Sequence, residues 1–89
     1  MGSFDVLNIY PNPAYEVINF GIMLPKDGRV TVGFIDILGQ TMFKKDYDGV
    51  RGYNNFTIST AQLNAAVYVA VVTYDNQIIR NKIMRRDRK

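Results

Sequence analysis

The stretch that decides the fold is Arg29–Tyr47, which reads RVTVGFIDILGQTMFKKDY. Apolar and smaller residues alternate along its first part, a two-residue period that is typical of a strand with one buried face. The apolar members of this alternation are Val30, Val32 and Phe34. Asp36–Gly39 then predicts a turn, because Asp can bond its own backbone and Gly can adopt a positive φ. A return strand is predicted over Gln40–Asp48, and the resulting hairpin needs other strands to cover its apolar face.

Five further segments predict strands on both sides of this hairpin. Their apolar residues alternate or fill both faces, and turn residues separate them about every ten positions. The segments are Phe4–Tyr10, Glu16–Leu24, Tyr53–Ser59, Val67–Tyr74 and Gln77–Met84. Thr60–Ala66 is too short for a stable helix, so we expect one turn or a crossover loop there, with Leu63 in the core.

Together these segments predict the all-β class, as a seven-stranded antiparallel immunoglobulin-like β-sandwich. A small closed barrel is the rival architecture. The chain has 89 residues, which is enough for one domain. We assign residues 4–84 to the sandwich and residues 85–89 to a flexible basic tail. Residues 1–3 look like a cloning scar rather than a secretory signal, so we expect a domain excised from a longer protein.

The composition argues against catalysis and cofactor binding. The chain has no histidine and no cysteine, which removes the commonest general base, the commonest metal ligand and thiolate chemistry. Two candidate groups remain: Ser59-Thr60 as nucleophiles, and Asp46 with Asp48 as an acid–base pair. We interpret the first as a strand-end turn and the second as a solvated strand end. We therefore expect no enzyme activity, no cofactor and no metal.

The positive charge is concentrated near the C-terminus. Residues 80–89 carry six positive charges and one negative, whereas the rest of the chain is slightly acidic. The basic pI thus describes this end and not the domain, so we expect no nucleic-acid partner. The basic tail could contact phosphates or anionic lipopolysaccharide, or simply suppress pairing on the last strand. No apolar run approaches the roughly 20 residues of a transmembrane segment.

The six tyrosines give a further alternative. They could form a stacking platform for a sugar or a nucleic acid, but they lie near strand ends, where amphipathic packing at the rim is the simpler interpretation. The six are Tyr10, Tyr15, Tyr47, Tyr53, Tyr68 and Tyr74.

Four segments together resemble one known family. Ile9–Ala14 contains YPNPA, Val30–Gln40 contains the pattern DxxGQ, Leu63–Val69 is similar to LxxGxYxV, and Lys82 lies in the last predicted strand. Their order and spacing resemble type A C-terminal sorting domains of the type IX secretion system. Two departures are Ala66, where the family has a glycine, and the tail, which extends beyond the family's usual end.

The resemblance implies an immunoglobulin-like sandwich that acts as a folded secretion signal in Bacteroidota. Such a domain crosses the periplasm and the outer membrane with its cargo and reaches the cell surface or the medium. The implied partners are translocon and sortase components, and the sortase joins the cargo to anionic lipopolysaccharide. The edge strands of the sandwich could also pair with a second copy of the chain and form a homodimer.

A signal of this kind is a surface that a receptor reads. The candidate parts are the rigid proline bend, the turn of the opening hairpin, and the last strand with its basic end. Each also has a purely structural interpretation, as a stiff linker, an ordinary turn or a charged edge strand. The residues are Tyr10, Pro11, Asn12, Pro13, Asp36, Gly39, Gln40, Tyr68, Lys82, Arg85 and Arg86.

Three function classes follow, and the first is the leading hypothesis. It is a non-catalytic signal that directs a cargo protein through the type IX system to the cell surface. The second is a retained, uncleaved scaffold or regulatory domain that binds another envelope protein through its edge strands or through Arg85, Arg86 and Arg88. The third is an accessory carbohydrate-binding or adhesion sandwich that uses Tyr47 and Tyr53.

Overall fold

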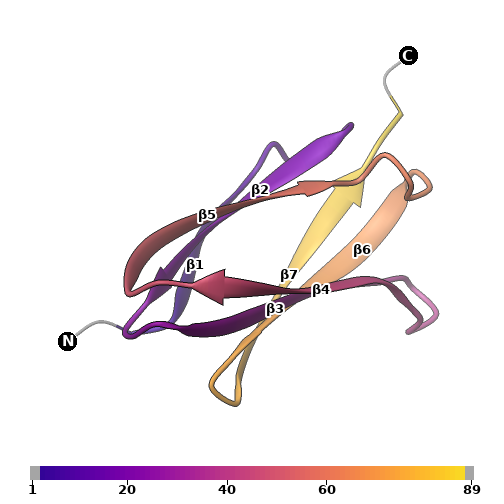
Figure 1. Cartoon of the computed structure of the whole chain (residues 1–89). Helices are drawn as coiled ribbons and strands as arrows, with labels where there is room; N and C mark the ends of the chain where they lie inside the picture. Colours follow the sequence, from indigo (N-terminus) through magenta and orange to yellow (C-terminus); the bar gives the residue numbers. More distant parts are fainter. Residues whose placement is uncertain (1–2, 88–89) are drawn as a thin grey trace.

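The chain folds into seven strands joined by turns and loops, as Figure 1 shows for a computed structural model that describes residues 3–87. No helix occurs in this range. The strands are β1 (Asp5–Tyr10), β2 (Val17–Leu24), β3 (Gly28–Ile35), β4 (Thr41–Gly49), β5 (Gly52–Ser59), β6 (Ala66–Tyr74) and β7 (Gln77–Arg85).

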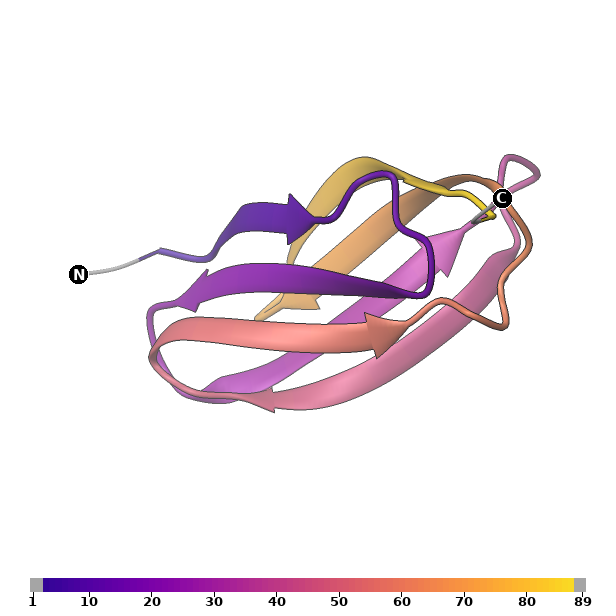
Figure 2. The same cartoon turned by 90° about the horizontal axis from the view of Figure 1, so that it is seen from above.

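The strands form two antiparallel sheets that pack as a sandwich. One sheet has the order β1-β2-β5, and the other has the order β4-β3-β6-β7 (Figure 2). The prediction of a seven-stranded immunoglobulin-like sandwich is therefore confirmed, and the closed barrel is not observed. The hairpin predicted over Arg29–Tyr47 is formed by β3 and β4. It is part of the larger sheet, because β3 pairs with β4 on one side and with β6 on the other.

The core lies between the sheets and follows from the period-two pattern. Alternate residues of the inner strands are fully buried, and Phe20 stacks on Phe34 across the sandwich at a centroid distance of 6.0 Å. Phe34 also stacks on Phe43 of β4 at 5.1 Å. Burying each such side chain contributes about 1.5–3 kcal/mol. Leu63 is buried in the core and lies in the turn predicted for this segment.

Several strand ends differ by one residue from the predicted ones, and two of these differences affect candidate residues. Gln40 belongs to the turn, since β4 begins at Thr41. Arg85 belongs to β7 and is buried, so it is not part of a tail. Met1 and Gly2 of the expected scar, and Arg88 and Lys89 of the expected tail, lie outside the described residues. Residues 3–87 contain no helix that is long and apolar enough to cross a membrane.

The two ends of the sandwich differ. At one end, called here the distal end, short turns at residues 25–27, 50–51 and 75–76 join the strands. At the other, called here the convergent end, lie the longer connections 11–16, 36–40 and 60–65 and residues 86–87 after β7. Figures 1 and 2 show the C-terminal end of β7 at this end of the sandwich.

Candidate functional site

The proline bend after β1 begins the site. Pro11 and Pro13 lack an N–H donor, so their backbone cannot pair as an ordinary strand. The peptide bonds that precede both prolines are cis. Asn12, between them, has a side-chain amide that can both donate and accept a hydrogen bond. The Asn12 side chain thus supplies a donor where the two prolines remove N–H donors from the backbone, and an acceptor in addition.

This bend lies along the edge of β7. The Asn12 Nδ2 donates to the Lys82 carbonyl at 3.4 Å, and the Met84 N–H donates to Asn12 Oδ1 at 3.0 Å. Backbone pairing then continues, because the Ala14 N–H donates to the Met84 carbonyl and the Arg86 N–H donates to the Ala14 carbonyl, both at 2.8 Å. Residues about 70 positions apart are joined in this way. The C-terminal half of the β7 edge is therefore covered by the chain's own N-terminal segment.

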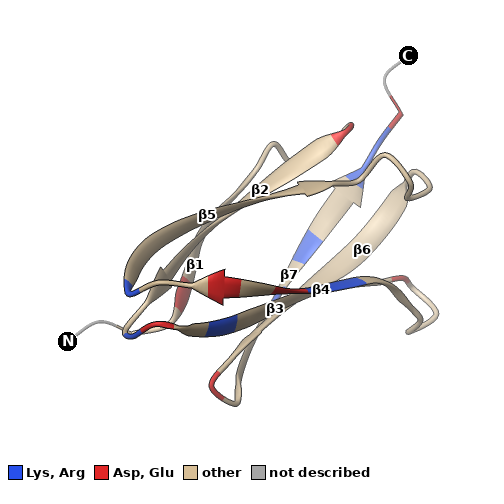
Figure 3. Cartoon of the chain, in the orientation of Figure 1, with Lys and Arg blue, Asp and Glu red and all other residues tan. Residues whose placement is uncertain are grey.

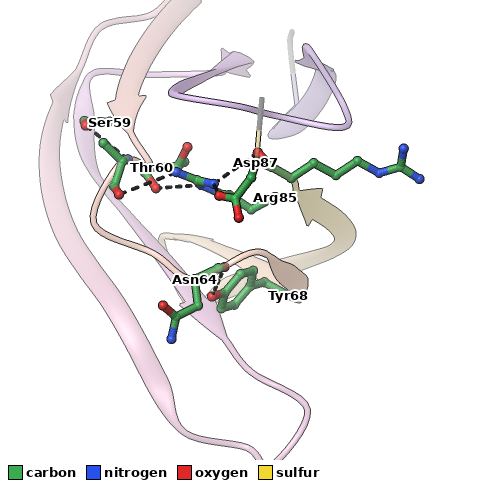
Figure 4. A network of polar contacts seen from close by, with 8 residues as sticks. Ser59, Thr60, Asn64, Tyr68, Arg85 and Asp87 are labelled. Carbon is green, nitrogen blue, oxygen red and sulfur yellow. Dashed lines mark hydrogen bonds and ion pairs between the residues drawn. The ribbon is translucent and has the colours of Figure 1, made fainter. Parts of the chain in front are cut away.

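Arg85 ties the end of β7 to the loop after β5 (Figure 4). Its Nε donates to the Thr60 carbonyl at 3.0 Å, and its Nη2 donates to the Ala61 carbonyl at 3.5 Å. Its Nη1 donates to the Arg86 carbonyl at 3.0 Å and to Asp87 Oδ1 at 2.7 Å. Burial to 8% exposure is tolerated because the guanidinium has five donors and several acceptors meet them.

Tyr68 has a structural role in the same network. Its ring is buried, and its hydroxyl donates to the Asn64 carbonyl at 2.7 Å, which fixes the loop before β6 (Figure 4). Ala66, which stands where the resembled family has a glycine, is the first residue of β6 and pairs with Arg85. Its φ is not positive, so alanine is accommodated without backbone strain.

Lys82 and Arg86 present the positive charge of the site. They flank a shallow hollow of about 270 Å³ that Asn12, Pro13, Ile83 and Met84 also line. Within residues 3–87 neither cation has an ion-pair partner, although Arg86 Nε lies 3.3 Å from the Met84 sulfur. Figure 3 shows cationic positions on β7 and just beyond its end. Much of the basic C-terminal region is thus part of the folded sheet and not of a tail.

The turn of the β3–β4 hairpin is held by Asp36. Its Oδ1 accepts hydrogen bonds from the N–H groups of Leu38 and Gln40, both at 2.9 Å. Backbone bonds close the same turn, from the Gly39 N–H to the Asp36 carbonyl and from the Asp36 N–H to the Gln40 carbonyl. Gly39 adopts a φ of 84°, as predicted for this position. The local structure accounts for both Asp36 and Gly39.

The sequence reasoning missed the two residues at the tip of this turn. Ile37 is 85% exposed and Leu38 is 79% exposed, more than any other large apolar side chain of the described chain. The available signal was an adjacent apolar pair inside a segment that otherwise contains turn residues. The turn lies at the convergent end, where it joins β3 to β4. The segments that contact the end of β7 are different ones, residues 11–16 and 60–65.

Tyr10 and the other tyrosines separate into different environments. The Tyr10 hydroxyl donates to Asn55 Oδ1 at 3.1 Å, across the outer face of the three-stranded sheet. Tyr53 is half exposed on the same sheet. Tyr47 instead stacks on Phe56 at 4.7 Å, and desolvation raises the pKa of its hydroxyl. Tyr47 and Tyr53 therefore do not form one stacking platform.

Two of the side chains considered for catalysis, those of Ser59 and Asp46, make hydrogen bonds within the fold. The Ser59 hydroxyl accepts from the Ala61 N–H at 3.4 Å, and Thr60 is fully buried. Asp46 Oδ1 accepts from the Thr31 hydroxyl at 2.7 Å, and its other oxygen faces Arg29 at 4.0 Å. The described part of the chain contains no group of three acidic side chains placed to hold a metal ion.

Comparison with known proteins shows that the chain matches the model of one protein family. Residues 8–86 match the family described as secretion system C-terminal sorting domain. The matched range includes the proline bend, the Asp36 turn and the whole of β7. The resemblance seen in the sequence motifs is therefore confirmed over almost the entire chain. A search of curated proteins gives no match.

Proposed function

Because the chain belongs to the family of secretion system C-terminal sorting domains, we propose that it is a non-catalytic signal that directs a cargo protein through the type IX system to the cell surface. Domains of this family generally act as sorting signals and not as catalysts. The observation that carries the proposal is the attachment of the Asn12 bend to β7, which gathers sequence motifs from both ends of the chain.

The convergent end has the properties of a surface that a receptor could read. Lys82 and Arg86 are exposed on either side of the hollow beside Asn12, and no described side chain neutralises them. Charged groups placed on a rigid framework steer a partner and fix its orientation. Arg85 and Tyr68 contribute indirectly, since both are buried and hold the loops that frame this surface.

The partners of this surface are components of the type IX translocon and of the sortase. The cargo then passes the periplasm in transit and ends at the outer membrane surface or in the medium. Attachment of the cargo to anionic lipopolysaccharide, cleavage of the domain, a homodimer through edge strands and an origin in Bacteroidota remain predictions. We assign the chain no cofactor and no nucleic-acid partner.

A reporter fusion tests this function. The whole chain is placed behind a secretory signal peptide and a fluorescent or enzymatic reporter in a strain with an active type IX system. We expect the reporter at the cell surface or in the medium, and retention in the periplasm when the translocon gene is deleted. Periplasmic retention in the competent strain would overturn the proposal.

The retained scaffold is the second candidate function, and the exposed Lys82 and Arg86 would serve it equally well. The two functions differ in what happens to the domain after export. A mass-spectrometric measurement of the exported reporter decides between them, because a sorted cargo loses the domain whereas a scaffold retains it. Of the arginines considered for a scaffold, Arg86 is exposed, Arg85 is occupied inside the fold, and Arg88 lies outside the described residues.

A further inference from the structure

The most exposed apolar side chains of the described chain are neighbours on one short turn. Ile37 and Leu38 are 85% and 79% exposed, although single exposed apolar residues elsewhere stay near one half. Scattered apolar residues on a surface are normal, whereas apolar residues gathered at one place mark a contact site. The pair therefore requires an explanation that the hairpin itself does not supply.

The turn that carries the pair is rigid. Asp36 Oδ1 holds the N–H groups of Leu38 and Gln40, and the Gly39 N–H is bonded to the Asp36 carbonyl. These bonds fix the backbone on both sides of the tip before any partner is present. A preorganised contact loses little conformational freedom on binding, which increases affinity without additional contacts.

We propose that Ile37 and Leu38 insert into an apolar pocket on a protein of the secretion machinery, and that Asp36 and Gly39 only position them. This inference rests on the proposed function and names the chemistry of one partner contact. It also reverses the roles expected from the sequence, where the polar residues of the turn were the recognition candidates. A few residues in well-packed, fully desolvated pockets typically provide most of the energy of a protein interface.

The charges around the tip favour a protein pocket over a lipid surface. Asp36 is the only ionisable residue between Ile35 and Phe43, and it carries negative charge. Elements that bind at a membrane surface combine a larger apolar face with lysine or arginine beside it. The nearest cations on this hairpin, Lys44 and Lys45, lie within β4 and not in the turn.

The first test compares two double variants of the reporter fusion. I37S/L38S removes the apolar tip, and the control V50S/I78S removes two half-exposed apolar side chains far from it. We expect delivery to fall about tenfold or more for the tip variant, as for loss of a central anchor. The control should be delivered like the parent, and both variants should melt like it. Normal delivery of I37S/L38S would overturn the inference and leave the proposed function intact, whereas failure of the parent fusion would overturn both.

The second test asks what Asp36 does. Asp36→Asn keeps an oxygen at the position that accepts the two backbone bonds, whereas Asp36→Ala removes it. We expect Asn to retain delivery and Ala to lose it. Equal loss in both variants would show that the machinery reads the carboxylate charge, which contradicts a positioning role.

The third test separates a protein from a lipid partner. A photo-crosslinking amino acid at position 38 of the fusion should yield an adduct with a protein of the secretion machinery. Purified chain should not sediment with vesicles of phosphatidylcholine and phosphatidylglycerol. Sedimentation that I37S/L38S abolishes would identify a lipid contact and overturn the inference.

Discussion

The distal and convergent ends of the sandwich are held together by different kinds of contact. At the distal end the buried Asn54 amide bonds the N–H and the carbonyl of Val50 and the carbonyl of Gly52, all within four residues. At the convergent end Asn12 bonds β7 across about 70 residues, and Arg85 reaches back about 25 residues to Thr60. Distant segments also meet at the distal end, where Phe4 packs on Tyr74 at 5.3 Å and the Tyr74 hydroxyl donates to the Lys26 carbonyl at 3.0 Å. The ends differ instead in the groups used, which at the convergent end are a buried guanidinium and an amide that pairs with a strand edge.

The span of the Asn12 and Arg85 contacts bears on how a folded signal works. Loops stabilised by local bonds can form early, whereas contacts between distant segments require most of the fold to be complete. Under the proposed function, a receptor that reads the convergent end recognises a finished domain. The distal end then serves stability alone, and changes at the two ends should separate stability from delivery.

The largest effect is expected for Arg85→Met at the convergent end. The change leaves the carbonyls of Thr60 and Ala61 without their partner and removes a buried hydrogen-bond network. We expect a loss of about 2–3 kcal/mol in the free energy of unfolding, measured by urea denaturation, together with reduced reporter delivery. Arg85→Lys should give a smaller loss of stability than Arg85→Met. Its ammonium group keeps the positive charge but cannot reproduce the planar set of donors of the guanidinium. A loss below about 0.5 kcal/mol would show that the network contributes little.

A smaller loss of stability is expected for Asn54→Ala at the distal end. Several backbone groups near Asn54 lose a partner, including the Ile22 carbonyl at 3.4 Å, but some can bond water instead. We expect a loss of about 1–2 kcal/mol in the free energy of unfolding. Reporter delivery should be unchanged at a temperature where the variant is folded. Loss of delivery in folded Asn54→Ala protein would contradict the division between the ends.

The bend at Asn12 should show the opposite pattern. Asn12→Ala removes two exposed hydrogen bonds to β7, so we expect a stability loss of only about 0.5–1 kcal/mol. Delivery should nevertheless fall, because the bend loses its side-chain bonds to the strand edge beside Lys82 and is then held only through Ala14. Asp27→Ala is the matched control, since it removes one exposed hydrogen bond, from the Arg51 N–H, at the distal end. Equal delivery of the two variants would argue against recognition of the bend.

The smallest effect concerns pH and Tyr47, which belongs to neither end. Desolvation raises the pKa of its hydroxyl above 10.0 in the folded chain. A raised folded pKa gives stability that is complete below the unfolded pKa and is lost as pH rises through the folded value. Tyr47→Phe should therefore flatten the decrease in melting temperature above about pH 10. An unchanged alkaline profile would show that other groups cause that decrease.

The turns of the distal end can be predicted from the sequence because their signals are local. Asp75 and Asn76 are residue types that tolerate a positive φ, which predicts a two-residue hairpin loop, and their φ values are 48° and 64°. The strand pattern likewise predicted the sandwich, since alternation records which residues face the core.

The convergent end could be predicted only in part. The proline bend was recognised, but nothing local indicates that Asn12 would pair with β7. In the sequence, Arg85 looks like the first residue of a charged tail. Its burial depends on the carbonyls of a loop that is distant in the sequence, so no local signal indicates it. Asp36 and Gly39 are recognisable from the sequence as motif and turn residues, whereas the turn signal does not reveal the exposure of the pair between them.

The most direct test of recognition at the convergent end is a matched charge removal at both ends of the reporter fusion. One variant, K82S/R86S, removes two exposed cations at the convergent end, and the other, K26S/R51S, removes two exposed cations at the distal end. Both change the net charge equally, so differences between them report position. We predict that K82S/R86S is folded but poorly delivered to the cell surface, whereas K26S/R51S is delivered normally. Equal delivery of the two variants, or loss only for the distal one, would contradict recognition at the convergent end.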